Sequence, residues 1–234
     1  MRSLVLPELQ IDDAKACLNQ HFGLTEFRAG QFNVISSVYS GRNTVVIMPT
    51  GSGKSLCYQL PAVLLPGTTV VVSPLIALMK DQVEQLTARG ISATFINSTL
   101  SDTERHERHR KLRAGEYKLV YVAPERFRSE NFVQALIDSN LALFAIDEAH
   151  CISQWGHDFR PDYAALGQVR KKLRPARTIA LTATATPEVR ADIARMLLLK
   201  DPHVFVAGFD RPNLHLDVVT VSGDEDKRRA CLSL

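Results

Sequence analysis

The sequence has few cysteines, no long apolar run and almost no excess of charge, and each shortage excludes a class of protein. No apolar run approaches the length of a membrane-spanning helix, so we expect no membrane partner. The four cysteines are scattered and form no closely spaced pairs. This excludes the usual zinc patterns and predicts a reducing compartment.

The overall composition is that of an ordinary globular protein. Apolar residues make up 45% of the 234 positions and charged residues 23%, which is enough apolar material for a sizeable core in one large domain or two small ones. The net charge is only +3 and the isoelectric point is near 8.7. Such a mild basic excess permits nucleic acid as a partner but does not establish it.

Short β-branched segments alternate with helical segments along most of the chain. We expect helices over 12–22 and 29–40, followed by strands at 44–48, 69–73, 93–96, 119–123, 143–147, 179–182 and 204–207. Several strands are apolar at consecutive positions, which is typical of parallel strands buried on both faces. Repeated β-α alternation predicts an α/β fold, a doubly wound, mostly parallel sheet with helices on both faces.

The helices between these strands carry their own signals. Ser101 and Glu104 form a capping box, and Thr186 caps a helix that has Pro187 at its first position. The apolar faces are expected at Leu75, Met79, Val83 and Leu86, and at Val189, Ile193, Met196 and Leu197. We expect one domain over 1–208 and a linker over 209–234, because 223–229 is a charged stretch.

The segment TGSGKS predicts a phosphate-binding loop. It lies between an apolar strand and a helix start, and its glycines allow backbone N–H groups to curl around an anion. Lys54 is placed to reach terminal phosphates and the Ser55 hydroxyl to hold Mg²⁺, although Met48 replaces the first glycine of the full pattern. The alternative is a simple Gly/Ser turn. The predicted phosphate ligands are Thr50, Gly51, Ser52, Gly53, Lys54 and Ser55.

A second polar site follows the apolar strand at 143–146. Asp147 is placed to bind Mg²⁺, Glu148 to orient and deprotonate a water molecule, and His150 to connect this site to the next segment. The alternative is an Asp-Glu turn that solvates the strand end. Thr182 and Thr184 either sense the acidic pair or simply end a strand, and the residues favour neither interpretation.

Residues 151–163 contain aromatic side chains among charged ones. Trp155, His157, Phe159 and Arg160 lie in a loop that begins one residue after His150. Aromatic faces interleaved with Arg and His suit stacking on unpaired bases. The alternative is that these aromatic side chains cover the core, but the position beside the acidic pair favours a nucleic-acid contact that is coupled to hydrolysis.

Together these segments resemble the RecQ family of DNA helicases in superfamily 2. MPTGSGKS resembles motif I, DEAH motif II, TAT motif III and CISQWGHDFRPDY the aromatic-rich loop of that family. SPLIALMKDQ and VAPERF are similar to motifs Ia and Ib. FGLTEFRAGQ is similar to the nucleotide-recognition motif, with Leu24 and Ala29 as departures, and FDRPNL to the segment that leads into a second lobe.

The resemblance implies further roles for individual residues. Gln31 would pair with the adenine edge and Arg28 would pack on its face. Ser73, Lys80 and Arg126 would contact the backbone of single-stranded DNA. The helix at 101–113 has mixed charge, and a solvated face is favoured over a DNA track there.

The resemblance also implies an activity, its cofactors and its partners. We expect the first RecA-like lobe of a 3′–5′ DNA helicase that uses ATP and Mg²⁺, acts on single-stranded DNA and duplex junctions, and needs a second RecA-like lobe absent from this chain. It would act in repair and recombination, in the cytoplasm or nucleoid, or in a eukaryotic nucleus. Two alternatives stay open: a non-catalytic module that binds nucleotide and single-stranded DNA, and a small-molecule P-loop kinase.

Overall fold

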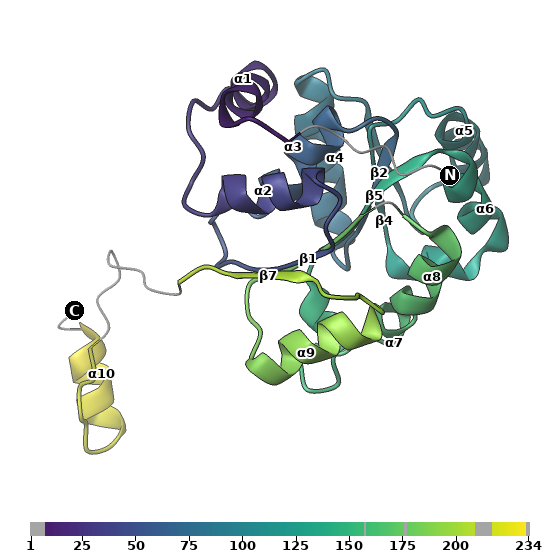
Figure 1. The fold of residues 1–234 in the computed structure, drawn as a ribbon. Helices are drawn as coiled ribbons and strands as arrows, with labels where there is room; N and C mark the ends of the chain where they lie inside the picture. Colours follow the sequence, from purple (N-terminus) through teal and green to yellow (C-terminus); the bar gives the residue numbers. More distant parts are fainter. Residues whose placement is uncertain (1–7, 157, 176, 209–216, 233–234) are drawn as a thin grey trace.

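The computed structural model describes residues 8–156, 158–175, 177–208 and 217–232. Within these residues, seven parallel strands form one sheet in the spatial order β3-β4-β2-β5-β6-β1-β7 (Figure 1). The strands are β1 Thr44–Ile47, β2 Thr68–Val72, β3 Ala93–Ile96, β4 Leu119–Val122, β5 Leu141–Ile146, β6 Thr178–Thr182 and β7 His203–Val206. The predicted strands and the parallel sheet are confirmed.

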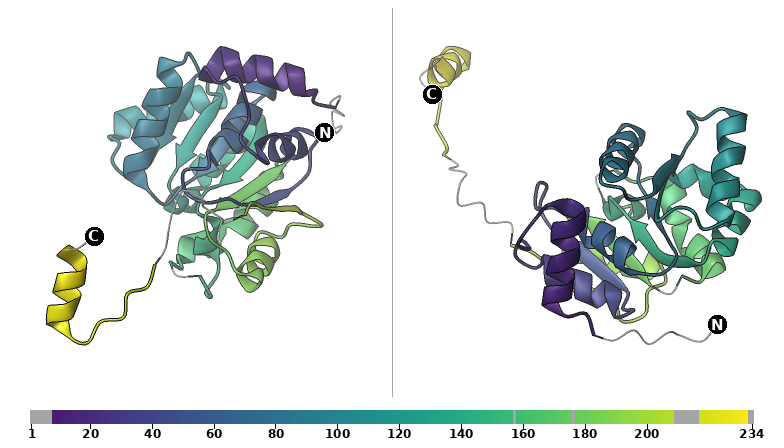
Figure 2. Two further views of the ribbon diagram at one scale, coloured as in Figure 1. Left: turned by 90° about the vertical axis from the view of Figure 1, so that its left-hand side faces the viewer. Right: turned by 90° about the horizontal axis from the view of Figure 1, so that it is seen from above.

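Helices cover both faces of the sheet, as Figure 2 shows from two further sides. Their buried side chains form two hydrophobic cores with those of the strands. The helices of one face are α1 Ile11–Phe22, α2 Gln31–Tyr39, α3 Leu56–Leu64 and α4 Ile76–Ala88. Those of the other are α5 Asp102–Arg113, η1 Pro124–Arg128, α6 Glu130–Asp138, η2 Ala149–Ile152, α7 Pro161–Ala164, α8 Leu166–Leu173 and α9 Pro187–Met196. Among the described residues, no helix is both long and apolar enough to cross a membrane.

Each buried strand contributes to both cores because its side chains alternate between the two faces. In β1, Val46 packs in the core beneath α1–α4, whereas Val45 and Ile47 pack in the core on the other side. Only the edge strand β7 alternates between half-buried and exposed residues. The consecutive apolar positions therefore identified the central strands correctly.

The helix ends follow from local chemistry. Helix α2 begins at Gln31, two residues later than expected, because Gly30 has a φ of 80° and cannot belong to the helix. The capping box of Ser101 and Glu104 forms at the start of α5, and the Thr186 side chain caps α9 ahead of Pro187. These two predictions are confirmed.

One expectation from the sequence is wrong in detail. Leu75 precedes α4 and is 42% exposed, so it lies outside the buried face of that helix. Met196 is half-buried and packs against the core with the rest of its predicted face. Most of the charged stretch at 223–229 lies in a helix, α10 Asp224–Leu232, which buries none of its residues. This helix lies apart from the sheet in both figures, and its place in a linker stays a prediction.

Gly167 is a position where packing opposes helix propensity. A Cβ atom there would overlap the carbonyl oxygen of Met196 at the end of α9. We expect Gly167→Ala to lower the free energy of unfolding by about 1–3 kcal/mol, although Ala is favoured over Gly inside a helix by about 1 kcal/mol. Urea unfolding followed by circular dichroism measures the change. The control Gly208→Ala meets no atom within 4 Å and should be neutral; equal stability of the two variants would contradict the proposed clash.

Candidate functional site

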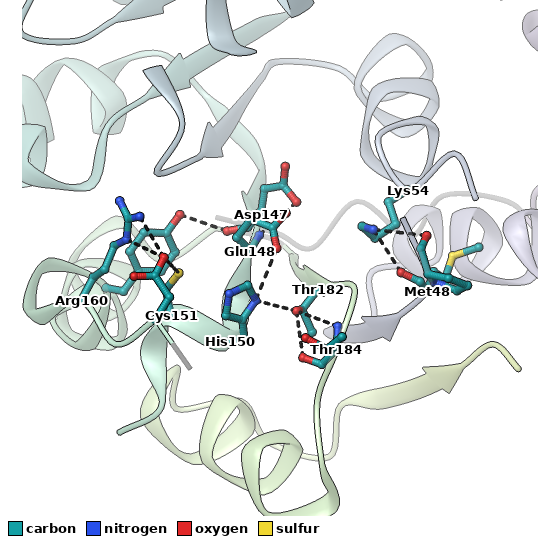
Figure 3. A network of polar contacts seen from close by, with 12 residues as sticks. Met48, Lys54, Asp147, Glu148, His150, Cys151, Arg160, Thr182 and Thr184 are labelled. Atoms are coloured by element: carbon teal, nitrogen blue, oxygen red, sulfur yellow. Dashed lines mark hydrogen bonds and ion pairs between the residues drawn. The ribbon is translucent and has the colours of Figure 1, made fainter. Parts of the chain in front are cut away.

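Three polar segments meet because the strands that carry them are neighbours in the sheet. β6 lies between β5 and β1, and the register aligns Ile146 with Ala180 and Ile47 with Thr182. The phosphate loop follows β1, the acidic pair follows β5, and Thr182 ends β6. Their side chains therefore gather at the carboxyl edge of the sheet, as Figure 3 shows.

The loop after β1 has the backbone that an anion site needs. Gly51 and Gly53 have φ values of 80° and 84°, a region that other residues rarely adopt. The Lys54 ammonium lies inside this loop and donates hydrogen bonds to the carbonyl oxygens of Met48 at 3.0 Å and Pro49 at 3.3 Å (Figure 3). The Ser52 hydroxyl also donates to the Pro49 carbonyl, at 2.6 Å.

Two residues expected to contact adenine hold the phosphate loop in place. Gln31 is 2% exposed, and its amide nitrogen donates to the carbonyl oxygens of Ser52 at 3.2 Å and Gly53 at 3.1 Å. Its amide oxygen accepts the backbone N–H of Arg28 at 2.8 Å, and the Arg28 guanidinium donates to the Gly51 carbonyl. Nothing in the sequence signalled this clamp. A role in adenine recognition for these two residues stays a prediction.

The acidic pair has two different environments, as expected from its position at a strand end. Glu148 adopts a left-handed backbone with a φ of 48°, so its carboxylate leaves the strand in another direction from that of Asp147. Burial and the nearby Glu148 carboxylate raise the pKa of Asp147 to about 6, whereas the Glu148 N–H and Lys54 act in the opposite direction. The Tyr163 hydroxyl fixes the backbone by donating to the Asp147 carbonyl at 3.0 Å.

His150 connects the acidic pair to the end of β6. Its Nδ1 lies 3.3 Å from Glu148 Oε2 and 2.8 Å from the Thr182 hydroxyl. That hydroxyl also contacts the backbone carbonyl and N–H of Thr184 at 3.1 and 3.4 Å (Figure 3). Thr182 therefore contacts the acidic pair through His150 and not directly, while the Thr184 side chain is exposed at the cavity described below.

The large side chains of residues 151–163, here called the aromatic segment, differ in exposure to solvent. Trp155 is 79% exposed and Phe159 is 38% exposed, whereas Tyr163 is completely buried. The alternative in which the aromatic side chains cover the core therefore holds for Tyr163 and not for Trp155. His157 lies outside the described residues. A Trp that is exposed to this extent is available to a ligand.

Close backbone contacts join this segment to His150. A Cβ atom on Gly156 would lie 2.5 Å from the His150 carbonyl oxygen, so only glycine allows the approach. The Trp155 N–H donates to the Ser153 hydroxyl at 3.1 Å, and that hydroxyl donates to Asp192 of α9 at 2.8 Å. Sequence reasoning missed Ser153 and Asp192, because they become partners only when η2 packs on α9.

An open cavity of about 620 Å³ joins the three segments. It is lined by residues from the phosphate loop, the acidic pair, the end of β6 and the aromatic segment, together with the turn before α4. They are Thr50, Pro74, Leu75, Glu148, His150, Asp158, Arg160, Ala183 and Thr184. Arg160 is held there by hydrogen bonds to Asp158, the nearer at 2.8 Å. This cavity places Glu148 and the aromatic segment on one continuous surface.

A model of the DEAD/DEAH box helicase family matches residues 28–193, which include the whole cavity lining. The chain belongs to the DEAD/DEAH box helicase family. It is 49% identical to the ATP-dependent DNA helicase RecQ of Pasteurella multocida over 202 residues. The matched residues make up 86% of this chain and 32% of that protein. It is 50% identical to RecQ of Bacillus subtilis over 208 residues, and this match covers 88% of this chain and 35% of that protein.

The resemblance to RecQ helicases is thereby confirmed, and the chain spans about a third of the length of these relatives. A hypothetical ATP-dependent RNA helicase from Sulfolobus tokodaii has the same fold, with a TM-score of 0.65 at 20% identity over 85% of this chain and 57% of that one. The chain is therefore a member of a helicase family and has the fold of a helicase domain.

The remaining residues predicted for this helicase lobe lie farther along the carboxyl edge. Ser73 is nearly buried, and its hydroxyl accepts the Leu75 N–H at 3.4 Å. Lys80 is exposed and pairs with Glu84 at 3.8 Å. Arg126 lies half-buried in η1, directly after β4. The cavity brings none of these three to the acidic pair, and their contacts with DNA stay predictions.

The oxygen ligands at the start of α3 and the end of β5 suit a magnesium ion. Magnesium prefers carboxylate and hydroxyl oxygens. Asp147 is a buried carboxylate beside a second carboxylate, so a cation there would relieve their repulsion. Ser55 stands directly before Leu56, the first residue of α3. These two residues fit the predicted metal.

Proposed function

We propose that this chain is the ATP-binding lobe of a RecQ-type 3′–5′ DNA helicase, in which nucleotide hydrolysis is coupled to single-stranded DNA by the aromatic segment. The observation that carries the proposal is the continuous polar path from Glu148 through His150 to Thr182. This path lies directly beneath the backbone of the segment that exposes Trp155.

The phosphates would be bound by the loop after β1. Its backbone N–H groups and the start of α3 favour an anion, and Lys54 is already inside the loop. When phosphate enters, the ammonium exchanges two carbonyl partners for phosphate oxygens, which form stronger, charge-assisted hydrogen bonds. Ser55 and Asp147 would hold Mg²⁺, which supplies charge neutralisation for the phosphates when it is bound.

Glu148 would orient the attacking water and accept its proton. Its side chain lines the cavity and is partly accessible, as a group that meets water and the terminal phosphate must be. His150 fixes the position of this carboxylate, because its Nδ1 lies 3.3 Å from Glu148 Oε2. Because the His150 carbonyl contacts Gly156, a DNA-induced shift of the aromatic segment would move His150 and thereby the water-activating carboxylate.

Single-stranded DNA would stack on Trp155 and Phe159, with Arg160 beside them. These side chains are exposed and come from one short segment. Stacking on aromatic side chains tolerates any base sequence, which suits a motor that moves along DNA. The RecQ relatives are named as DNA helicases, which supports DNA over RNA as the nucleic acid.

Removal of the Lys54 ammonium should weaken nucleotide binding. A hydrogen bond to a charged group contributes about 1.5–3 kcal/mol, so Lys54→Ala should weaken binding of a fluorescent ATP analogue roughly tenfold or more. The matched control is Lys172→Ala, which removes a lysine paired with Glu130 at 2.8 Å. Equal affinities of both variants would show that the loop binds no phosphate.

Replacement of Glu148 should separate binding from turnover. In a chimera where this chain replaces the matching segment of Bacillus subtilis RecQ, Glu148→Gln should still bind ATP but hydrolyse it at least roughly a hundredfold more slowly, because the amide accepts no proton. Steady-state phosphate release measures turnover. Retained turnover would assign the base to another residue.

Truncation of Trp155 should reduce coupling while leaving nucleotide binding intact. In the same chimera, Trp155→Ala should lower the stimulation of phosphate release by single-stranded DNA and weaken DNA binding by about 1–3 kcal/mol for each lost stacking contact. Ile137→Ala is the comparison, because it removes an exposed apolar side chain of α6, outside the aromatic segment. Undiminished stimulation in Trp155→Ala would exclude the segment from DNA coupling.

A further inference from the structure

One side chain of α9 holds the base of the aromatic segment. The Asp192 carboxylate accepts the Ser153 hydroxyl at 2.8 Å, and the oxygen of that hydroxyl accepts the Trp155 N–H at 3.1 Å. Ser153 is buried, and a buried hydroxyl is costly unless its partners are in place. The backbone that exposes Trp155 is therefore tied to α9 through Ser153.

Helix α9 is a rigid support for this contact. Val189 and Ile193 are buried in the core on that side of the sheet, and the Thr186 side chain caps the first turn. Ile193 follows Asp192 directly, so the carboxylate belongs to a turn of helix that close packing fixes. A displacement of Ser153 would therefore stretch the hydrogen bond to Asp192 and would not carry α9 with it.

The carboxylate of Asp192 is ionised and accepts a second donor. Arg195, three residues further along α9, donates to the other carboxylate oxygen at 2.6 Å. Hydrogen bonds from Arg195 and Ser153 lower the pKa of Asp192. Hydrogen bonds to a charged acceptor are roughly twice as strong as those between neutral groups. The contact with Ser153 is therefore stronger than a contact between a hydroxyl and a neutral acceptor.

The outer part of the aromatic segment and α9 share a cavity of about 220 Å³. Trp155 and Phe159 line it from the segment, and Arg195 and Met196 line it from α9. Side chains on the two sides of a void lack the dispersion contacts of a packed interface. The position of this part of the segment therefore depends more on hydrogen bonds, including the one to Asp192, than on apolar packing against α9.

Ser153 is also joined to His150 and thereby to the acidic pair. Its N–H donates to the His150 carbonyl at 3.1 Å. The His150 imidazole in turn lies 3.3 Å from the Glu148 carboxylate. A chain of contacts thus runs from Asp192 through Ser153 and His150 to Glu148, and Trp155 joins this chain at Ser153.

We propose that Asp192 is a positioning residue that anchors the aromatic segment, through Ser153, so that DNA stacked on Trp155 acts on His150. The inference rests on the proposed function and adds α9 to it. With Ser153 fixed, a stacked base turns the segment about this point and moves Gly156 against the His150 carbonyl, which it already touches. Without the anchor, the same base would lift the segment away from α9 and from His150 together.

The single tryptophan of the chain allows a direct measurement of the anchor. We expect Asp192→Ala to increase the nanosecond motion of Trp155, which lowers the residual anisotropy in time-resolved fluorescence. Asp192→Asn keeps an oxygen acceptor for Ser153 and should retain most of the anisotropy of the unchanged chain. Arg195→Gln is the matched control on the same helix, because it removes the other donor and leaves the contact with Ser153 in place.

Phosphate release tests whether the anchor serves coupling. In the chimera with Bacillus subtilis RecQ, Asp192→Ala should lower the stimulation by single-stranded DNA roughly tenfold, the factor for one lost hydrogen bond to a charged group. Ser153→Ala should give the same loss, and the double variant should be no worse, because both changes remove one interaction. A residue that served only stability would lower hydrolysis with and without DNA alike, and its loss would add to that of Ser153→Ala.

The outcomes separate this inference from the proposed function. If Asp192→Ala keeps the stimulation of the unchanged chimera, or if its loss adds to that of Ser153→Ala, the anchor is excluded, while a reduced stimulation in Trp155→Ala would leave the DNA motor intact. If the unchanged chimera shows no stimulation by single-stranded DNA, the inference and the coupling part of the proposed function are both overturned. Circular dichroism establishes that each variant is folded, and Ser153→Ala provides the test if Asp192→Ala loses its fold.

Discussion

The parallel register of β5, β6 and β1 is the constraint on which the candidate site depends. Because these strands are adjacent and end at the same level, the loops that follow them lie beside one another. The apolar side chains of these strands are almost completely buried in two cores, so the strand ends are rigid. Chemistry that requires Lys54, Asp147 and Glu148 within reach of one another is thus positioned by hydrophobic burial and not by the polar residues themselves.

His150 is the polar residue that connects the acidic pair, the end of β6 and the aromatic segment. It is buried, its imidazole contacts Glu148 and Thr182, and its carbonyl lies against Gly156. A buried polar group is costly unless it is satisfied, so its partners are tightly specified. A displacement of the aromatic segment would therefore change the contacts of the imidazole, and in the proposed function this is the route from DNA to the Glu148 carboxylate.

The sequence predicted the structural features that depend on residues close together in the chain. The positions and parallel direction of the strands and the caps at Ser101 and Thr186 follow from patterns within a few residues. The spatial order of the strands, which brings the phosphate loop to the acidic pair, does not follow from such patterns. The sequence also did not predict the clamp of Gln31 on the Ser52 and Gly53 carbonyls, because side chains gain such partners only in the folded chain. The helix at 224–232 did have a signal, acidic residues at its start followed by basic ones, which suits the helix dipole.

The phosphate loop pairs its own cation when no nucleotide is bound. Lys54 occupies the site and uses the Met48 and Pro49 carbonyls as temporary partners. Under the proposed function, these two hydrogen bonds must break before the ammonium can bind a phosphate oxygen, which forms a stronger, charge-assisted bond. Nucleotide exchange therefore involves a rearrangement of the loop.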